Sequence, residues 1–182
     1  MIDFTPLRDK KVTIADLAAE LTKDDLVKFT HELNDKILDM ISSCQDSDVI
    51  FEPKDPKAND PYAEDPADIH IAWTLGHLIV HITASMEESA ALAAEMARGV
   101  EFHGRSRSEI PWQTIKTIAQ CRHRMEESRR MCIASLEMWP DEPYLDNTHK
   151  PWESMPPIDA RGRYLLGFTH TDSHLEQIMD VI

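Results

Sequence analysis

A long segment of helical periodicity between residues 65 and 99 constrains the fold more than any other feature. Its apolar side chains recur at helical spacing and form the stripe Ile71, Leu75, Leu78, Ile82 and Met86. Asp65 can cap its start, Pro66 suits the first helical position, and Gly99 is typical of a helix stop. At 1.5 Å per residue, a helix from 66 to 98 would be about 50 Å long, which leaves room for a bend.

Three more helices are predicted, over residues 13–43, 111–138 and 159–182. The first can be interrupted at Thr22, where the sequence TKDD offers a new N-cap with acidic residues behind it. Pro140 ends the second of the three. The chain has only five glycines and many Ala, Leu, Glu and Met residues, which favours helix. For 182 residues we therefore expect one all-α domain, a four-helix bundle over residues 1–182.

Two irregular connections separate these helices. Residues 45–64 are rich in Pro, Asp and Lys, which indicates a solvated loop. Residues 139–157 carry Trp139, Tyr144 and Trp152. Because exposed aromatic rings are unfavourable, we expect this second connection to pack over the bundle, with a role in a pocket wall as the alternative.

Two histidines near the C-terminus, His170 and His174, are four residues apart. Positions i and i+4 of a helix differ by about 40° around the axis, so both imidazoles share a face. The same stripe continues through Ile178 and Val181, which directs the pair toward the core. With nine histidines in the chain, the pair is a candidate either for metal ligation or for hydrogen bonding in the core. A metalloprotease helix would need Glu where Thr171 stands.

A second pair with the same spacing, His77 and His81, lies in the long segment. On a helical wheel His81 is about 110° from the centre of the apolar stripe and His77 about 150°. His81 is therefore the favoured third ligand and His77 the alternate, and a hydrogen-bonded flanking residue is the competing interpretation for both. His123 and His149 are expected at the surface.

The spacing of these residues resembles two motifs of the DinB/YfiT-like superfamily of metalloenzymes. In the first, Trp73 is followed by Thr74, Leu75 and, eight residues after the Trp, His81. The second is a C-terminal His-x-x-x-His-x-x-Gln-Ile, which begins at His170 and ends at Ile178. Together with the helix order, the resemblance covers most of the chain.

The resemblance implies a four-helix bundle in which His81, His170 and His174 bind a divalent metal, with His77 as the alternate ligand. Three imidazoles suit Zn, Ni or Fe, and three protein ligands leave a position open for water or substrate. The family further implies a thiol S-transferase or related hydrolase that acts on a small molecule, such as a low-molecular-weight thiol. The alternative is a non-catalytic metal-binding or dimerising bundle. No catalytic residue beyond the ligands can be named.

Ligating histidines usually donate their second N–H to an outer acceptor. The candidates for this role are Asp172, Glu176 and Gln177 near the C-terminal pair and Glu87 or Glu88 beyond His81.

Charge and composition limit the partners. A net charge of −14 disfavours nucleic acid and anionic membranes as partners. No apolar run reaches the roughly 18 residues of a membrane span, and the N-terminus lacks a signal-peptide core, so we expect a cytoplasmic protein. The apolar faces of the long helices would suit a homodimer. Cys44, Cys121 and Cys132 are odd in number and lack C-x-x-C spacing, which favours reduced thiols.

Overall fold

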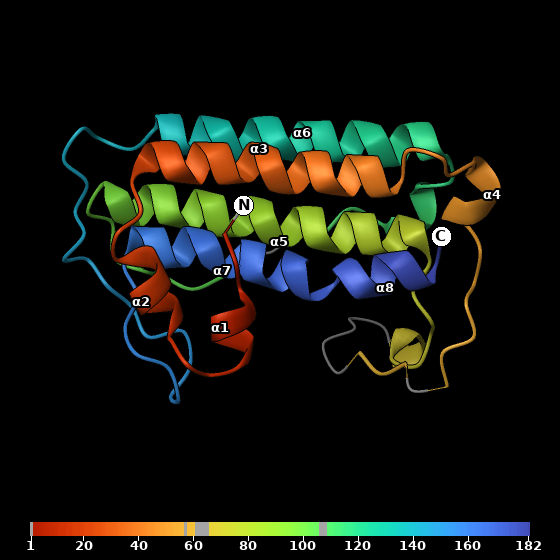
Figure 1. The fold of residues 1–182 in the computed structure, drawn as a ribbon, viewed down its shortest axis with the longest axis horizontal. Helices are drawn as coiled ribbons and strands as arrows, with labels where there is room; N and C mark the ends of the chain where they lie inside the picture. Colours follow the sequence, from red (N-terminus) through yellow and green to blue (C-terminus); the bar gives the residue numbers. More distant parts are fainter. Residues whose placement is uncertain (1, 57, 61–65, 106–108) are drawn as a thin grey trace.

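The chain folds into a layered set of helices, and the prediction of an all-α fold is confirmed. The computed structural model describes residues 2–56, 58–60, 66–105 and 109–182. Its long helices are α3 (Lys23–Met40), α5 (Leu75–Ala97), α6 (Ile118–Glu137) and α7 (Ala160–Ser173). They run alongside one another in Figure 1, which agrees with the expected four-helix bundle.

Short elements complete the fold. They are α1 (Thr5–Arg8), α2 (Ile14–Ala18), α4 (Asp46–Val49), α8 (Leu175–Asp180) and the 3-10 turns η1 (Pro66–Asp68) and η2 (Trp112–Thr114). The described residues form no strand, and their β pairing is limited to an isolated antiparallel bridge between His149 and Ile158. Within the same residues, no helix combines the length and the apolar character that crossing a membrane requires.

Helix α5 is the centre of the molecule. Twenty of its 23 residues are buried, and it packs against α7 on one side and α6 on the other. A helix that is apolar or small on nearly every face must be surrounded by other elements. Its contact with α7 is unusually close at Gly167, where an added Cβ would lie 2.6 Å from the Ser85 carbonyl oxygen and 2.6 Å from Ser89 Cβ. The two helices therefore hold their side chains in a fixed register.

The predicted start of the second helix at Asp65 and Pro66 is wrong. Pro66 begins only a 3-10 turn, and Asp65 lies outside the described residues. Helix α5 begins at Leu75, because the side chain of Thr74 accepts a hydrogen bond from the backbone N–H of His77 and holds residue 74 in an extended conformation. The helix is therefore about 35 Å long rather than 50 Å. Its predicted end is confirmed, since Gly99 follows with φ +85°.

The starts of two other helices follow the same rule. The predicted interruption at Thr22 is confirmed: α2 ends at Ala18, and Thr22 forms a capping box with Asp25 at the start of α3. The predicted start of the third helix near residue 111 is wrong, because Thr117 forms a capping box with Gln120 and α6 begins at Ile118. The preceding residues form η2 and an irregular segment.

The C-terminal helix begins as predicted, with Asp159 accepting hydrogen bonds from the N–H groups of Arg161 and Gly162. It does not continue unbroken to the C-terminus. His174 ends α7 with ψ −3° and at the same time precedes α8. The second histidine of the pair thus stands at a break between two helices.

The connection between residues 139 and 157 is only partly packed against the bundle. Trp139 is 5% exposed, as expected for packing. Tyr144 and Trp152 are 62% and 55% exposed, so the expectation that the aromatic rings of this connection are covered is wrong for these two. The other connection, expected to be irregular over residues 45–64, contains the single turn of helix α4.

Candidate metal centre

Three histidines from two parts of the sequence meet between α5 and the end of α7. Each of His81, His170 and His174 offers one ring nitrogen, and these nitrogens lie within 4.8 Å of one another. Nε2 of His81 and Nε2 of His170 are 2.7 Å apart. The ring centroids are separated by 4.7 to 5.0 Å. His81 is 7% exposed, and the other two are half-buried.

Two of these imidazoles are held from outside by oxygen acceptors. Nδ1 of His81 lies 3.1 Å from Oε1 of Glu109, and Nδ1 of His174 lies 2.9 Å from Oε1 of Gln177. A carboxylate or amide oxygen accepts, so each Nδ1 carries the hydrogen and each Nε2 presents its lone pair. In this tautomer Nε2 can bind a metal while Nδ1–H is held by the outer oxygen, and the donor set therefore fits a divalent cation.

The other outer acceptors proposed from sequence lie elsewhere. Glu87 pairs with Arg124 and Asp172 with Arg8. Glu88 pairs with Arg105, and Glu176 is exposed. Sequence reasoning identified Gln177 and missed Glu109, which comes from the segment between α5 and η2. No local signal could have identified Glu109, because it lies 28 residues from His81 in the sequence.

His77, the alternate ligand, does not join the cluster. Its ring stacks between two indoles, 4.5 Å from Trp73 and 4.7 Å from Trp112 between centroids. Trp73 also lies against His81 at 4.5 Å and His174 at 5.6 Å. Because α5 begins after Trp73, the indole is free to fold back over the histidines and covers one side of the cluster.

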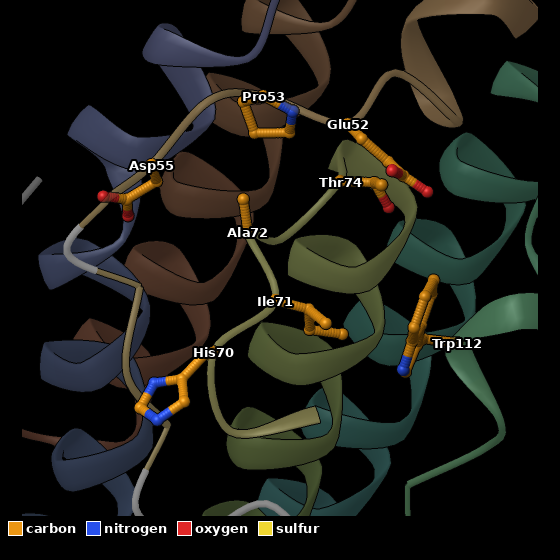
Figure 2. Close-up of a pocket in the computed structure, with 8 residues that line it drawn as sticks. All are labelled: Glu52, Pro53, Asp55, His70, Ile71, Ala72, Thr74 and Trp112. Carbon is orange, nitrogen blue, oxygen red and sulfur yellow. The ribbon is translucent and has the colours of Figure 1, made fainter. Parts of the chain in front are cut away.

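A cavity of about 320 Å³ lies on the outer side of this aromatic stack. Figure 2 shows loop residues Glu52, Pro53 and Asp55 above it, with His70 and Trp112 on opposite sides of Ile71. Trp112 is shared between the cavity wall and the stack on His77. The cavity therefore adjoins the stack formed by Trp73, His77 and Trp112, which lies beside the histidine cluster.

The cysteines and the remaining histidines considered from sequence stand apart from the cluster. All three cysteines are buried free thiols, and burial raises the pKa of Cys121 to about 12 and that of Cys132 further. They are therefore protonated at neutral pH and poor nucleophiles. His123 is exposed as expected, with 76% of its side chain accessible. His149 is half-buried rather than exposed, and its ring stacks on Phe102.

Comparison with known proteins adds one finding. The family model for the DinB superfamily matches residues 18–178, which include all three histidines. No curated protein and no solved structure gives a significant match to the chain.

Proposed function

Because the chain belongs to the DinB superfamily, we propose that it is a divalent-metal-dependent enzyme that acts on a small molecule at His81, His170 and His174. The reaction we favour is the transfer of a thiol to an electrophilic substrate. The alternative is a related hydrolysis, in which water takes the place of the thiol. The observation that carries the proposal is the convergence of three imidazoles, two of which have Nδ1 fixed by an outer oxygen.

The arrangement supports chemistry rather than a closed structural site. Three protein ligands leave at least one position open, which is typical of catalytic metal centres. A divalent cation bound there would lower the pKa of a coordinated thiol or water near neutral pH. Glu109 would hold the ring of His81 in place, and Trp73 would exclude water from one side of the cluster.

The first experiment is metal analysis of the untagged protein, with circular dichroism to monitor folding. We expect about one metal per chain in the wild type, and loss of the metal with helicity retained in His81→Ala and in the double variant His170→Ala with His174→Ala. His77→Ala tests the alternate ligand and should keep the metal. His123→Ala is the matched control, because that side chain is exposed.

Metal loading then permits a screen of thiols and electrophiles. Turnover that needs both the metal and the three histidines would support the transferase, whereas water alone as the acceptor would indicate the hydrolase. Wild-type protein that binds no metal after reconstitution would contradict the proposal and leave a histidine-bearing helical module. Loss of folding on chelation would indicate a structural metal instead.

A further inference from the structure

The cavity of about 320 Å³ lies where three parts of the chain meet at the start of α5. In the first turn of α5, a Cβ added at Gly76 would lie 2.9 Å from the carbonyl oxygen of Ile115 and 3.3 Å from the side chain and carbonyl oxygen of Val49. Val49 is the last residue of α4, and Ile115 directly follows η2. This close packing brings the loop after α4 toward η2, so that Glu52 and Trp112 line the same cavity (Figure 2).

Hydrogen bonds fasten that loop to the segment that leads into α5. The backbone N–H of Asp60 donates to the carbonyl oxygen of Ile69 at 2.7 Å, and Nδ1 of His70 donates to the carbonyl oxygen of Ala58 at 3.2 Å. The N–H of Ala58 donates to the carbonyl oxygen of Asp55 at 3.1 Å, which closes a turn between them. The cavity is therefore built from connected elements, and its volume lies within the range of small-molecule sites, about 300–1,000 Å³.

The lining of the cavity attracts positive charge. It includes the carboxylates of Glu52 and Asp55, and no Lys or Arg is among the described residues that line it. The side chain of Glu52 forms no hydrogen bond or ion pair with another residue of the described part of the chain. Because Nδ1 of His70 donates to a carbonyl oxygen, the neutral imidazole keeps Nε2 as a further acceptor. An ammonium ion supplies both the charge and the N–H donors that such groups attract.

The polar groups are spread around the cavity, which suits an organic cation better than a metal ion. Figure 2 shows Glu52 and Asp55 on opposite sides of it. In the described ranges of the chain, the three histidines of the metal centre are the one group whose ligand atoms all come within 4.8 Å of one another. Glu52, Asp55 and His70 therefore do not converge on a point where a metal ion could be held.

Apolar and aromatic surface completes the lining. Ile71 and Ala72 contribute aliphatic side chains. The indole of Trp112 stacks one face on His77 at an interplanar angle of 2°, and its remaining surface lines the cavity. The π face of an indole attracts a neighbouring cation, so this wall can contact both the charged and the apolar part of a ligand.

We infer that the cavity binds a small organic ammonium ion, with its charge against the carboxylate of Glu52 and its apolar part against Ile71 and Trp112. The inference does not depend on the proposed function, because none of the lining residues belongs to the histidine cluster. It assigns the chain a second ligand site, one that takes a cation rather than a metal-bound thiol.

The test is titration of the whole chain with benzylammonium, followed through the backbone amide resonances of residues 71–74. We expect these resonances to shift saturably. Benzyl alcohol has the same ring without the charge and should bind about tenfold more weakly, and the anion benzoate more weakly still. Equal binding of benzylammonium and benzyl alcohol, or no saturable response to benzylammonium, would overturn the proposal.

Glu52→Gln removes the carboxylate charge and keeps the shape of the side chain. Because Glu52 is exposed, we expect benzylammonium to bind about threefold more weakly, as for an exposed ion pair, while the affinity for benzyl alcohol stays unchanged. Glu137→Gln removes the same charge from the exposed last residue of α6 and is the matched control. Equal affinities of the two variants for benzylammonium would contradict the role of Glu52.

Trp112→Leu separates attraction to the cation from apolar packing. The preference for benzylammonium over benzyl alcohol should fall about threefold. A parallel loss of both ligands would overturn the placement of the charge at the indole. If the dispersion of the spectra shows that Trp112→Leu is unfolded, Glu52→Gln decides the proposal.

The metal centre and the cavity can fail separately. The double variant His170→Ala with His174→Ala should bind benzylammonium as the wild type does, so an absence of metal would leave this readout intact. Loss of benzylammonium binding in the folded double variant would overturn the assignment of an independent site.

Discussion

His81 on α5 and His170 on α7 place their Nε2 atoms 2.7 Å apart, although 89 residues separate them in the sequence. Two neutral imidazoles can share one hydrogen at this distance, and His81 already donates its Nδ1 hydrogen to Glu109. His81 must then present a lone pair toward His170. The position of His81 therefore depends both on the packing of α5 against α7 and on the contact with Glu109.

Glu109 should control the affinity for the metal. Glu109→Ala removes the acceptor that fixes the tautomer of His81, so we expect metal binding about 10- to 100-fold weaker, measured by competition with a chromophoric chelator. Glu109→Gln keeps an oxygen acceptor and should fall between this variant and the wild type. Glu101→Ala changes an exposed residue of the same segment and serves as the control. An affinity in Glu109→Ala equal to that of the control would show that the contact has no orienting role.

Gly167 should be intolerant of any side chain. In Gly167→Ala the new Cβ would overlap the Ser85 carbonyl oxygen and Ser89 of α5, and neither helix backbone can move aside cheaply. We expect a loss of about 1–3 kcal/mol in the free energy of unfolding, measured by urea denaturation, together with weaker metal binding as α5 and α7 separate.

The control for this overpacking is Ala91→Ser, which adds one heavy atom at an exposed position of α5. It should change the free energy of unfolding by less than about 0.5 kcal/mol. Similar effects of the two changes would mean that the close approach of the helices does not set the register of the histidines.

The fold class could be predicted from sequence because helix formation depends on periodicity and composition that are local. The errors arose at helix starts. Thr74 and Thr117 cap α5 and α6, yet the apolar pattern begins several residues earlier in each case and favoured Pro66 and Pro111 as starting points. A pattern of apolar residues does not distinguish a helix from the extended residues that lead into it, whereas a side-chain cap does.

The three clustered histidines could be found from sequence because helical spacing determines which face each residue occupies. His81 was preferred over His77 because it lies about 40° closer to the centre of the apolar stripe on a helical wheel. The structure brings His81 to the cluster and leaves His77 between two indoles. Glu109 could not be found in this way.

Trp73 should report metal binding. Its ring is 4.5 Å from that of His81 and 5.6 Å from that of His174, so Co(II) or Ni(II) bound to these histidines would quench its fluorescence. We expect most of the metal-dependent quenching to disappear in Trp73→Phe. Trp152→Phe is the control, because that ring is exposed in the connection before α7 and should leave the quenching unchanged. Full quenching in Trp73→Phe would place the bound metal away from this cluster.

His149 should make the folded protein sensitive to mild acid. Its ring stacks on Phe102 with a centroid distance of 3.9 Å, its Nε2 is buried without a hydrogen-bond partner among the described residues, and burial is the main cause that lowers its pKa from 6.5 to about 4. As the pH falls below 6.5, the unfolded chain binds a proton at this imidazole that the folded chain does not. Stability contributed by the neutral ring is therefore complete above pH 6.5 and is lost progressively toward pH 4.

Replacing the ring tests this directly. His149→Phe keeps an aromatic ring next to Phe102 and removes the proton site, so we expect its urea midpoint to fall less than that of the wild type between about pH 7 and about pH 5. The measurement is made on metal-free protein, so that proton competition at the histidine cluster contributes equally to both. His123→Phe changes an exposed imidazole and should retain the wild-type pH dependence. Identical slopes for His149→Phe and wild type would mean that His149 takes up its proton equally in the folded and unfolded chains.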